Sequence, residues 1–220
     1  VQTANLTQGF GGVCVFVNDK LDAETIAAIA ANGVKLIVLR CAGFNNVDLP
    51  AAKAHGISIR RVPAYSPEAV AEHAVALMLT LARKTHKAYN RVREQNFSLE
   101  RLNGFNIHGR TIGIIGTGKI GQAFAKIMLG FGAKVLAYDL YPSDALKALG
   151  IAYVEISQLM AEADIISLHC PLTDETRHIL DKDAFEKMKS GVYIINTARG
   201  ACIDERALVE ALKSGKVAGA

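Results

Sequence analysis

The sequence predicts an α/β fold whose sheets are built from parallel strands. Short apolar runs rich in β-branched residues alternate with helical patterns along all 220 residues, an arrangement that places helices on the faces of a parallel sheet. Midway along the chain, a glycine-rich turn joins one of these strands to a helix, which is typical of a nucleotide-binding β-α-β unit. We therefore expect two domains, each built from one series of β/α elements.

The first series forms the domain expected at 1–103. Gly33 and Gly56 follow two of its helical patterns and end them. The strands are expected at 13–17, 35–39 and 57–62, and the first two helices at 23–31 and 49–54.

A long helix is expected at 67–93, ahead of a domain boundary near 103–108. Its pattern is apolar on nearly all sides from Ala69 to Ala82 and then becomes basic and polar, so its first part should be buried and its second part exposed. Such a helix suits a connection between domains or the interface of a homodimer. The second domain, 104–220, is expected to have strands at 111–115, 134–138, 153–155, 165–169 and 192–197, and helices at 120–130, 143–149, 157–162, 182–189 and 205–213.

Composition and charge exclude several classes of partner. Half of the residues are hydrophobic, 21% are charged and the formal net charge is only +4. Basic residues are scattered among acidic ones, which disfavours nucleic acid and anionic lipid as partners. Glu72 and His73 interrupt the longest apolar run, so no membrane span is expected.

The cysteines and the chain ends indicate a cytoplasmic protein and a fragment. The four cysteines form no C-x-x-C pair and lie in or beside apolar runs, where thiols usually stay reduced in the core. The first ten residues lack the layout of a signal peptide. Because the chain begins at Val1 and stops at Ala220 inside the start of an expected strand, we expect a longer protein. The cysteines are Cys14, Cys41, Cys170 and Cys202.

The segment 111–121 reads TIGIIGTGKIG and places G-x-G-x-x-G between an apolar strand and a helix. Gly116 permits the tight turn, Gly118 lets the backbone approach a diphosphate, and Gly121 lets the helix pack closely on the strand. The helix start adds free N–H groups and the positive end of the helix dipole. The segment predicts a dinucleotide site, against the alternative of a turn that merely contains glycine.

Asp139 ends the strand that follows this helix. A carboxylate at this position accepts hydrogen bonds from the ribose hydroxyls of adenosine, and it would repel the 2′-phosphate of NADP. Strand, glycines, helix, second strand and acid occur in the required order, which favours the dinucleotide site over a chance turn. The expected cofactor is therefore NAD.

Three segments at the ends of predicted strands are candidates for chemistry, because ligands bind at the carboxyl ends of parallel strands. They are CAGF at 41–44, HCP at 169–171 and TARG at 197–200. Arg199 follows a buried run, and its planar guanidinium matches a carboxylate or a carboxylate next to a carbonyl. From these residues alone, an arginine at a helix start or on the surface is an equally good interpretation.

The chain resembles the D-2-hydroxyacid dehydrogenases nearly from end to end. The resemblance is carried by RCAGFNNVD at 40–48, VPAYSPEAVAEH at 62–73, the glycine motif, HCP at 169–171 and INTARG at 195–200. Tyr65 and the segment 44–46 look most like the D-lactate dehydrogenases of that family. The resemblance implies a Rossmann-type doubly wound parallel sheet that binds NAD, and a partial flavodoxin-like substrate domain before it.

The resemblance also implies roles for individual residues. Arg199 matches the catalytic arginine that binds the substrate's carboxylate and carbonyl and polarises the carbonyl for hydride attack. The N–H groups of Ala42 and Gly43 match those that hold the carboxylate, and Tyr65 matches an aromatic side chain lining the same pocket. The cofactor contacts implied are Lys119 and Ile120 at the diphosphate, where many relatives have His in place of Lys119, then His169, Cys170 and Pro171 beside adenosine, and Thr197 and Ala198 near the nicotinamide.

The family's proton donor is a His oriented by a Glu, and the resemblance places both beyond Ala220. Reduction of a keto group without a positioned donor is typically about 10²- to 10⁴-fold slower, so the 220 residues alone are expected to bind NAD but to be poorly active or inactive. Five of the six histidines are expected to be structural, and His169, at the carboxyl edge of the sheet, is expected beside adenosine rather than as a substitute proton donor. No metal site is expected, because no His, Cys or acidic pair has ligand spacing.

The leading hypothesis is a cytoplasmic, homodimeric, NAD-dependent oxidoreductase that interconverts pyruvate and D-lactate. Another 2-keto acid, bulkier or phosphorylated, is the alternative within the same class. A non-catalytic NAD(H)-sensing protein is the alternative from a different class, because relatives of this fold act as transcriptional corepressors that use the dinucleotide to control dimerisation. A natural truncation without activity is a third possibility.

Overall fold

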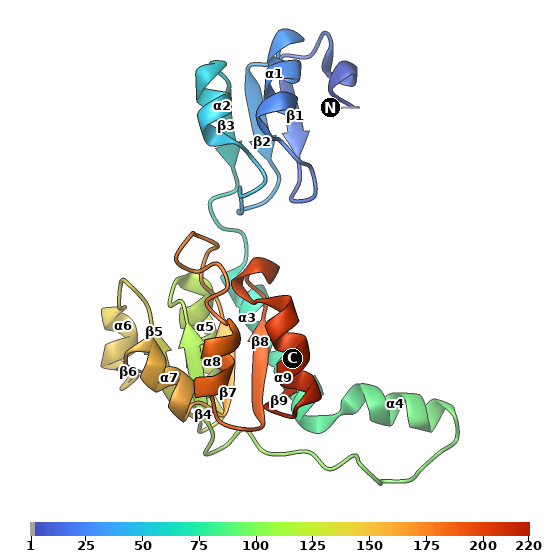
Figure 1. The fold of residues 1–220 in the computed structure, drawn as a ribbon, viewed down its shortest axis with the longest axis vertical. Helices are drawn as coiled ribbons and strands as arrows, with labels where there is room; N and C mark the ends of the chain where they lie inside the picture. Colours follow the sequence, from blue (N-terminus) through green and yellow to red (C-terminus); the bar gives the residue numbers. More distant parts are fainter. Residues whose placement is uncertain (1–2) are drawn as a thin grey trace. The chain divides into compact units, whose positions relative to one another are not determined.

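The computed structural model describes residues 3–220, which form two compact units (Figure 1). The first unit ends at Tyr65 and the second covers Ser66–Ala220. Each unit has one sheet, and every strand pair in both sheets is parallel. The predicted α/β class is therefore confirmed.

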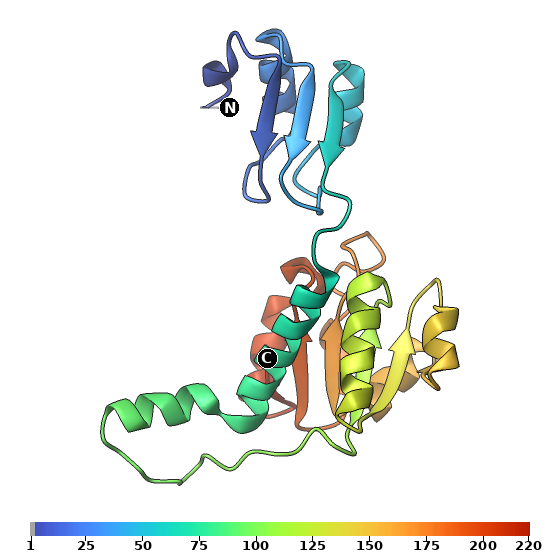
Figure 2. The ribbon, with the colours of Figure 1, turned by 180° about the vertical axis from the view of Figure 1, so that it is seen from behind.

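The first unit is a three-stranded sheet covered by two helices on one face. Figure 2 shows both helices behind the sheet. Ile26 and Ile29 of the first helix are buried against Ile37 and Leu39 of the central strand. The elements are a 3₁₀ turn η1 (Ala4–Thr7), strands β1 (Gly12–Val15), β2 (Leu36–Leu39) and β3 (Ser58–Arg61), and helices α1 (Ala23–Ala31) and α2 (Leu49–Ala54).

One expectation about this unit is wrong. Cys14 was expected in the core, but its side chain is exposed, whereas Cys41, Cys170 and Cys202 are buried. In β1 the side chains alternate between the two faces of the sheet. Cys14 pairs with the exposed Val38, on the face that α1 and α2 do not cover.

The second unit is built on a six-stranded sheet of order β6-β5-β4-β7-β8-β9. The chain starts in the middle, runs to one edge, and returns to the other side of the first strand, which is the order of a doubly wound Rossmann sheet. The point of reversal lies between β4 and β7. The strands are β4 (Thr111–Ile115), β5 (Lys134–Tyr138), β6 (Ala152–Tyr153), β7 (Ile165–Leu168), β8 (Val192–Asn196) and β9 (Val217–Gly219).

Helices cover both faces of this sheet. Figure 1 shows α7, α8 and α9 in front of it, and Figure 2 shows α3 and α5 on the opposite face. Met78, Phe124 and Met128 pack on the α3 and α5 side, and Leu159 and Phe185 on the other. The bounds are α3 (Pro67–Arg83), α4 (Thr85–Arg93), α5 (Lys119–Gly130), α6 (Asp144–Ala148), α7 (Ile156–Glu162), α8 (Lys182–Lys187), η2 (Gly200–Cys202) and α9 (Glu205–Lys213).

The long helix expected at 67–93 is two helices, α3 and α4, separated at Lys84. Lys84 adopts a left-handed conformation, with φ 53° and ψ 34°. The returning chain explains the break, because the N–H of Phe105 donates to the carbonyl of Ala82 at 3.1 Å, a carbonyl that a continuous helix would use internally. Gly104 permits this approach, since a Cβ there would overlap the same carbonyl oxygen. Helix α3 was expected to be buried on nearly all sides, but it buries one face only and residues 68, 69, 72, 73, 76 and 77 are exposed. As expected, the second part of the segment is exposed, because α4 has no buried residue.

The compact units divide earlier in the chain than the boundary expected near 103–108. They meet at Tyr65 and Ser66, because α3 packs against α5 and β8 and so belongs to the second unit. Within residues 3–220, every helix falls short of the length and apolarity that crossing a membrane requires.

Candidate functional site

The register of the sheet gathers four predicted site positions at its carboxyl edge. Ile115 pairs with Tyr138 on one side and with Leu168 on the other, and Leu168 pairs with Asn196. The residue after each of these strands therefore lies in one row at this edge. The row consists of Gly116, Asp139, His169 and Thr197.

Two of the three motif glycines are required by close backbone contacts. Gly116 has φ +95°, and a Cβ on it would lie 2.5 Å from the backbone nitrogen of Cys170. A Cβ on Gly121 would overlap the carbonyl oxygen of Gly116, so the helix could not pack this closely on the turn. A Cβ on Gly118 would meet nothing within 4 Å. The turn is therefore tight on its protein side and open at Gly118.

The start of α5 suits an anionic ligand. Gly118 is the N-cap of this helix and contributes no side-chain cap, so the first N–H groups have no side-chain acceptor from the cap. Lys119 is exposed and Ile120 is half-buried in the first turn. Free amides, the positive end of the helix dipole and a nearby lysine fit the diphosphate of a dinucleotide.

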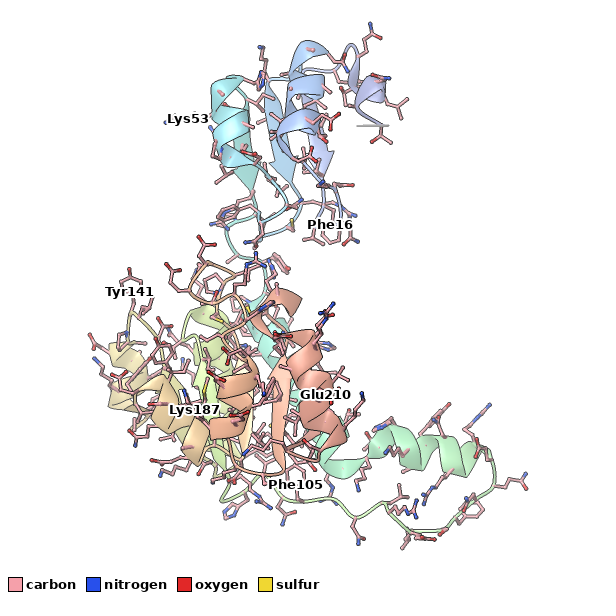
Figure 3. The ribbon with its side chains drawn as sticks, in the orientation of Figure 1. Phe16, Lys53, Phe105, Tyr141, Lys187 and Glu210 are labelled. Atoms are coloured by element: carbon pink, nitrogen blue, oxygen red, sulfur yellow. The ribbon has the colours of Figure 1, made fainter. Side chains whose placement is uncertain are left out.

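The Asp139 carboxylate lies directly against the glycine turn. Its Oδ2 accepts hydrogen bonds from the N–H of Thr117 at 2.5 Å and from the Thr117 hydroxyl at 3.0 Å. Its Oδ1 accepts one from the N–H of Tyr141 at 2.8 Å; the Tyr141 side chain itself is exposed (Figure 3). A carboxylate offers about four acceptor positions, so capacity remains for a ribose hydroxyl.

Thr117 and Tyr153 are two residues of this site that we did not anticipate. The Tyr153 hydroxyl donates to the Thr117 hydroxyl at 2.9 Å and accepts from the N–H of Ser143 at 2.8 Å. Thr117 stands between two motif glycines, so its position could have indicated a role. Tyr153 carries no such signal, because pairing of β5 with β6 brings it to the turn.

The His169 ring is enclosed beneath α5. Its centroid is 4.9 Å from that of Phe124, and Nε2 is 2.9 Å from the Ser167 hydroxyl, while Nδ1 is buried with no hydrogen-bond partner among the described residues. Burial lowers the pKa of His169 to about 4, so the ring is neutral at pH 7. It is unsuited to donate a proton in a neutral-pH reaction. No group of three His, Cys, Asp or Glu side chains in residues 3–220 is arranged to hold a metal ion.

Cys170 and Pro171 continue the chain from His169 along the turn. The backbone of Cys170 lies against Gly116. Burial and the neighbouring Cys202 thiol raise the pKa of Cys170 to about 12, so its thiol is protonated and unreactive. Pro171 is exposed, and its carbonyl accepts a hydrogen bond from the Thr176 hydroxyl at 2.6 Å.

Asn196 holds the turn that carries Arg199. Its Oδ1 accepts from the N–H of Ala198 at 2.9 Å, and its Nδ2 donates to the carbonyl of Arg199 at 2.9 Å. Arg199 is half-buried, and its Nη1 donates to the Ala198 carbonyl at 2.8 Å. The Thr197 hydroxyl oxygen is buried with no hydrogen-bond partner in the described part of the chain. No role is predicted for Asn196 from the sequence, although an Asn at the end of a strand often closes a turn in this way.

The predicted substrate residues lie in the first unit, after β2 and β3. The guanidinium of Arg61 donates to the Ala42 carbonyl at 2.9 Å, and its Cζ lies 5.2 Å from the centre of the Phe44 ring. The Cys41 thiol donates to the Gly43 carbonyl at 3.3 Å. These contacts use the carbonyl groups of Ala42 and Gly43, whereas the predicted substrate contacts use their N–H groups. Tyr65 is 68% exposed.

A hollow of about 210 Å³ lies at the opposite, amino edge of the larger sheet and includes Phe105 and Tyr193 in its wall. Its charged residues are paired with one another: Asp164 accepts from Lys189 at 3.0 Å and is 4.0 Å from Arg110. Asp164 also accepts from the N–H of Thr111 at 2.9 Å, where β4 starts. These contacts hold the strand starts together, away from the glycine turn.

The chain belongs to the D-isomer specific 2-hydroxyacid dehydrogenase family, whose NAD binding domain matches residues 75–220. It is 55% identical over 216 residues to the D-lactate dehydrogenase of Escherichia coli (strain K12), and 54% identical over 219 residues to 2-hydroxyacid dehydrogenase homolog 1 of Schizosaccharomyces pombe. These matches cover 98% and 99% of this chain.

Among solved structures, the chain is similar to D-lactate dehydrogenase from Aquifex aeolicus complexed with NAD and lactic acid. The TM-score is 0.91, the sequence identity is 41%, and the match covers 98% of this chain and 65% of that one. The chain spans 66% of the length of the two curated relatives. The NAD-binding fold and the family are thereby established for the part of the protein described.

Proposed function

We propose that the complete protein is an NAD-dependent oxidoreductase that interconverts pyruvate and D-lactate. The observation that carries the proposal is the Asp139 carboxylate, hydrogen-bonded to the backbone of the glycine turn with acceptor capacity remaining. The names of the similar proteins support the substrate pair. Tyr65 and the short segment at Phe44 also favour a small substrate.

The second unit supplies the cofactor contacts in this proposal. Amide groups of the turn and of Lys119 and Ile120 bind the diphosphate, and Asp139 accepts from the adenosine ribose. The segment 169–171 lines the adenosine side, and Thr197 and Ala198 lie near the nicotinamide. Bound NADH supplies the hydride. A second negative charge beside Asp139 would be repelled at short range, which favours NAD over NADP.

The keto acid is bound and polarised by the chain's own residues. Arg199 presents a planar, permanently charged fork to the carboxylate and carbonyl, which orients the carbonyl and stabilises negative charge developing on its oxygen. The N–H groups of Ala42 and Gly43 hold the carboxylate, and Tyr65 lines the pocket. In this reading the first unit is part of the substrate-binding domain.

We also propose that the protein is a homodimer. The arm formed by α4 and residues 94–103 carries four large apolar side chains that are at least half exposed: Tyr89, Val92, Phe97 and Leu99. Several large exposed apolar side chains on one short segment favour a protein-protein interface there. A cytoplasmic location is proposed on the four cysteines, all of which are free.

Fluorescence titration with NADH and NADPH, followed by turnover assays on the complete protein, tests the proposal. We expect saturable NADH binding, much weaker NADPH binding, and oxidation of NADH with pyruvate that yields D-lactate in a chiral assay. The variant Asp139→Asn should weaken NADH binding and reduce the preference over NADPH. Absence of saturable NADH binding to the complete protein would refute the proposal.

The same assays separate the alternatives. Turnover that is faster with a bulkier or phosphorylated 2-keto acid than with pyruvate would replace the substrate and leave the reaction class intact. The non-catalytic NAD(H)-sensing protein would be favoured by tight NADH binding without turnover of any 2-keto acid, together with NADH-dependent dimerisation.

A further inference from the structure

We propose that Tyr153 is a positioning residue for NAD, acting through Thr117 on the ribose-binding carboxylate of Asp139. This inference rests on the proposed function and adds a specificity-determining residue to it. Tyr153 lies outside the glycine motif; 36 positions separate it from Thr117.

The strand register explains how the Tyr153 ring reaches the turn. Tyr153 of β6 pairs with Ala137 of β5, and β5 ends at Tyr138, immediately before Asp139. The pairing therefore places Tyr153 beside the carboxyl end of β5. Tyr153 is half-buried, and the ammonium of Lys147 lies 6.0 Å from its ring centre.

Three hydrogen bonds form a chain that ends on the carboxylate. The Ser143 N–H donates to the Tyr153 oxygen at 2.8 Å, the Tyr153 hydroxyl donates to Thr117 at 2.9 Å, and the Thr117 hydroxyl donates to Asp139 Oδ2 at 3.0 Å. Each hydroxyl has one hydrogen and an ionised carboxylate only accepts. The direction of the whole chain is therefore set by the charge of Asp139.

These hydrogen bonds fix the position of Asp139 Oδ2, so the free acceptor positions of the carboxylate are held in one orientation. Thr117 is only 3% exposed, so water cannot readily replace the Tyr153 hydroxyl as donor to it. Hydrogen bonds to an ionised acceptor are strong and polarise their neighbours. Asp139 is thereby held against the turn, at a fixed position relative to the amides of α5.

The consequence is selectivity between the two dinucleotides. A carboxylate that is held in place cannot rotate away from a 2′-phosphate, and it meets the ribose hydroxyls without reorganising. Loss of the Tyr153 hydroxyl should therefore weaken NADH binding while leaving the weak NADPH binding nearly unchanged. The ratio of the Kd for NADPH to the Kd for NADH should therefore fall.

The test compares Tyr153→Phe, Thr117→Val and Thr117→Ser in the complete protein by fluorescence titration with NADH and NADPH. Tyr153→Phe keeps the ring, and we expect its Kd for NADH to rise about 2- to 12-fold, the range of one net hydrogen bond. Thr117→Val should raise the Kd for NADH similarly, whereas Thr117→Ser keeps the hydroxyl and should bind NADH like the wild type. The change should be larger in the Kd for NADH than in the KM of the keto acid, because neither side chain is assigned a contact with the substrate.

Tyr193→Phe is the matched control, because Tyr193 packs on Phe105 at a centroid distance of 4.7 Å and lines the hollow at the opposite edge. It should bind NADH like the wild type. Wild-type Kd values for NADH in both Tyr153→Phe and Thr117→Val would overturn the inference. So would a parallel rise in the Kd of NADPH and the KM of the keto acid, which indicates general damage. Failure of the wild-type protein to bind NADH would instead refute the proposed function.

Discussion

Arg199 reaches the carboxyl edge of the sheet on a turn that Asn196 closes at both ends. The two hydrogen bonds of that amide, to the N–H of Ala198 and the carbonyl of Arg199, are each 2.9 Å long. In the proposed mechanism the Arg199 side chain meets a planar carboxylate and carbonyl, and it needs such support because small displacements of a binding group cost large factors in rate. His169 and Cys170, which follow β7 at the same edge, are both uncharged at neutral pH.

Arg199→Lys should lower kcat/KM for pyruvate about 10- to 100-fold in the complete protein, through a higher KM and a lower kcat. Lysine keeps the charge but loses the bidentate fork, and a charge-assisted hydrogen bond contributes about 1.5 to 3 kcal/mol. Steady-state kinetics measure the change. Arg206→Lys, on the exposed face of α9, is the control and should be neutral. Wild-type kinetics in Arg199→Lys would remove Arg199 from the mechanism.

His169 should make the free energy of unfolding depend on pH. Its pKa is about 4 in the folded protein and about 6.5 when unfolded, so protons bind the unfolded chain preferentially between these values. Its contribution is complete above about pH 6.5 and is lost as the pH falls towards about 4, with a total of about 3 kcal/mol.

Urea unfolding at pH 7.5 and pH 4.5 measures this contribution. His169→Gln should lose less stability between the two pH values than the wild type does, whatever its absolute stability. His55→Gln changes an exposed histidine at the end of α2 and should retain the wild-type dependence. Equal pH dependence in all three proteins would contradict the burial of a neutral His169.

At the scale of elements, the site depends on how closely α5 approaches the end of β4. The contact is made by backbone on both sides, between Gly121 and the carbonyl of Gly116, and between Gly116 and Cys170. Gly118, between these two contacts, has open space around its Cα and provides no side-chain cap for the first turn of α5. Binding and packing are therefore coupled through one glycine-lined turn.

Gly121→Ala should destabilise the protein by about 1 to 3 kcal/mol, because the methyl group would push α5 away from the turn at Gly116. It should also weaken NADH binding, since the amides of α5 would shift. Gly130→Ala is the matched control in the same helix: a Cβ there meets nothing within 4 Å, and stability should rise by up to about 1 kcal/mol. Thermal unfolding and NADH titration measure both. Equal behaviour of the two variants would show that the close approach is unimportant.

At the scale of the whole molecule, the second unit contains an arm with little support of its own. Helix α4 has no buried residue, and Figure 2 shows it extending away from the sheet of this unit. Isolated helices of this length are marginal in water. A partner surface that covers the arm would stabilise it, which is the basis of the proposed homodimer.

The double variant Phe97→Asp and Leu99→Asp should shift the complete protein from dimer to monomer. It replaces two apolar side chains, 74% and 79% exposed, with charges that would be buried in the proposed interface. Light scattering coupled to size-exclusion chromatography gives the mass. Leu6→Asp, which changes a side chain 75% exposed in the first unit, should leave the mass unchanged. A dimer that persists in the double variant would exclude the arm as its interface.

Local patterns in the sequence predict much of this fold. Strands 111–115 and 134–138 and helices 23–31, 49–54 and 205–213 have the expected bounds, because apolar periodicity and capping residues act over a few positions. The break at Lys84 was missed, since it follows from the return of residues 104 and 105 to the end of α3. A contact between distant segments leaves no local pattern.

The sequence by itself determined the glycine turn, the acid after β5 and the family to which they belong, because a diphosphate and a ribose require particular residue types at short spacing. Only the tertiary structure decided which residues hold that acid in place. Thr117 donates to Asp139, Tyr153 donates to Thr117, and Ser143 donates to Tyr153. Hydrogen bonds between such distant positions depend on strand pairing and register, which composition and spacing do not specify.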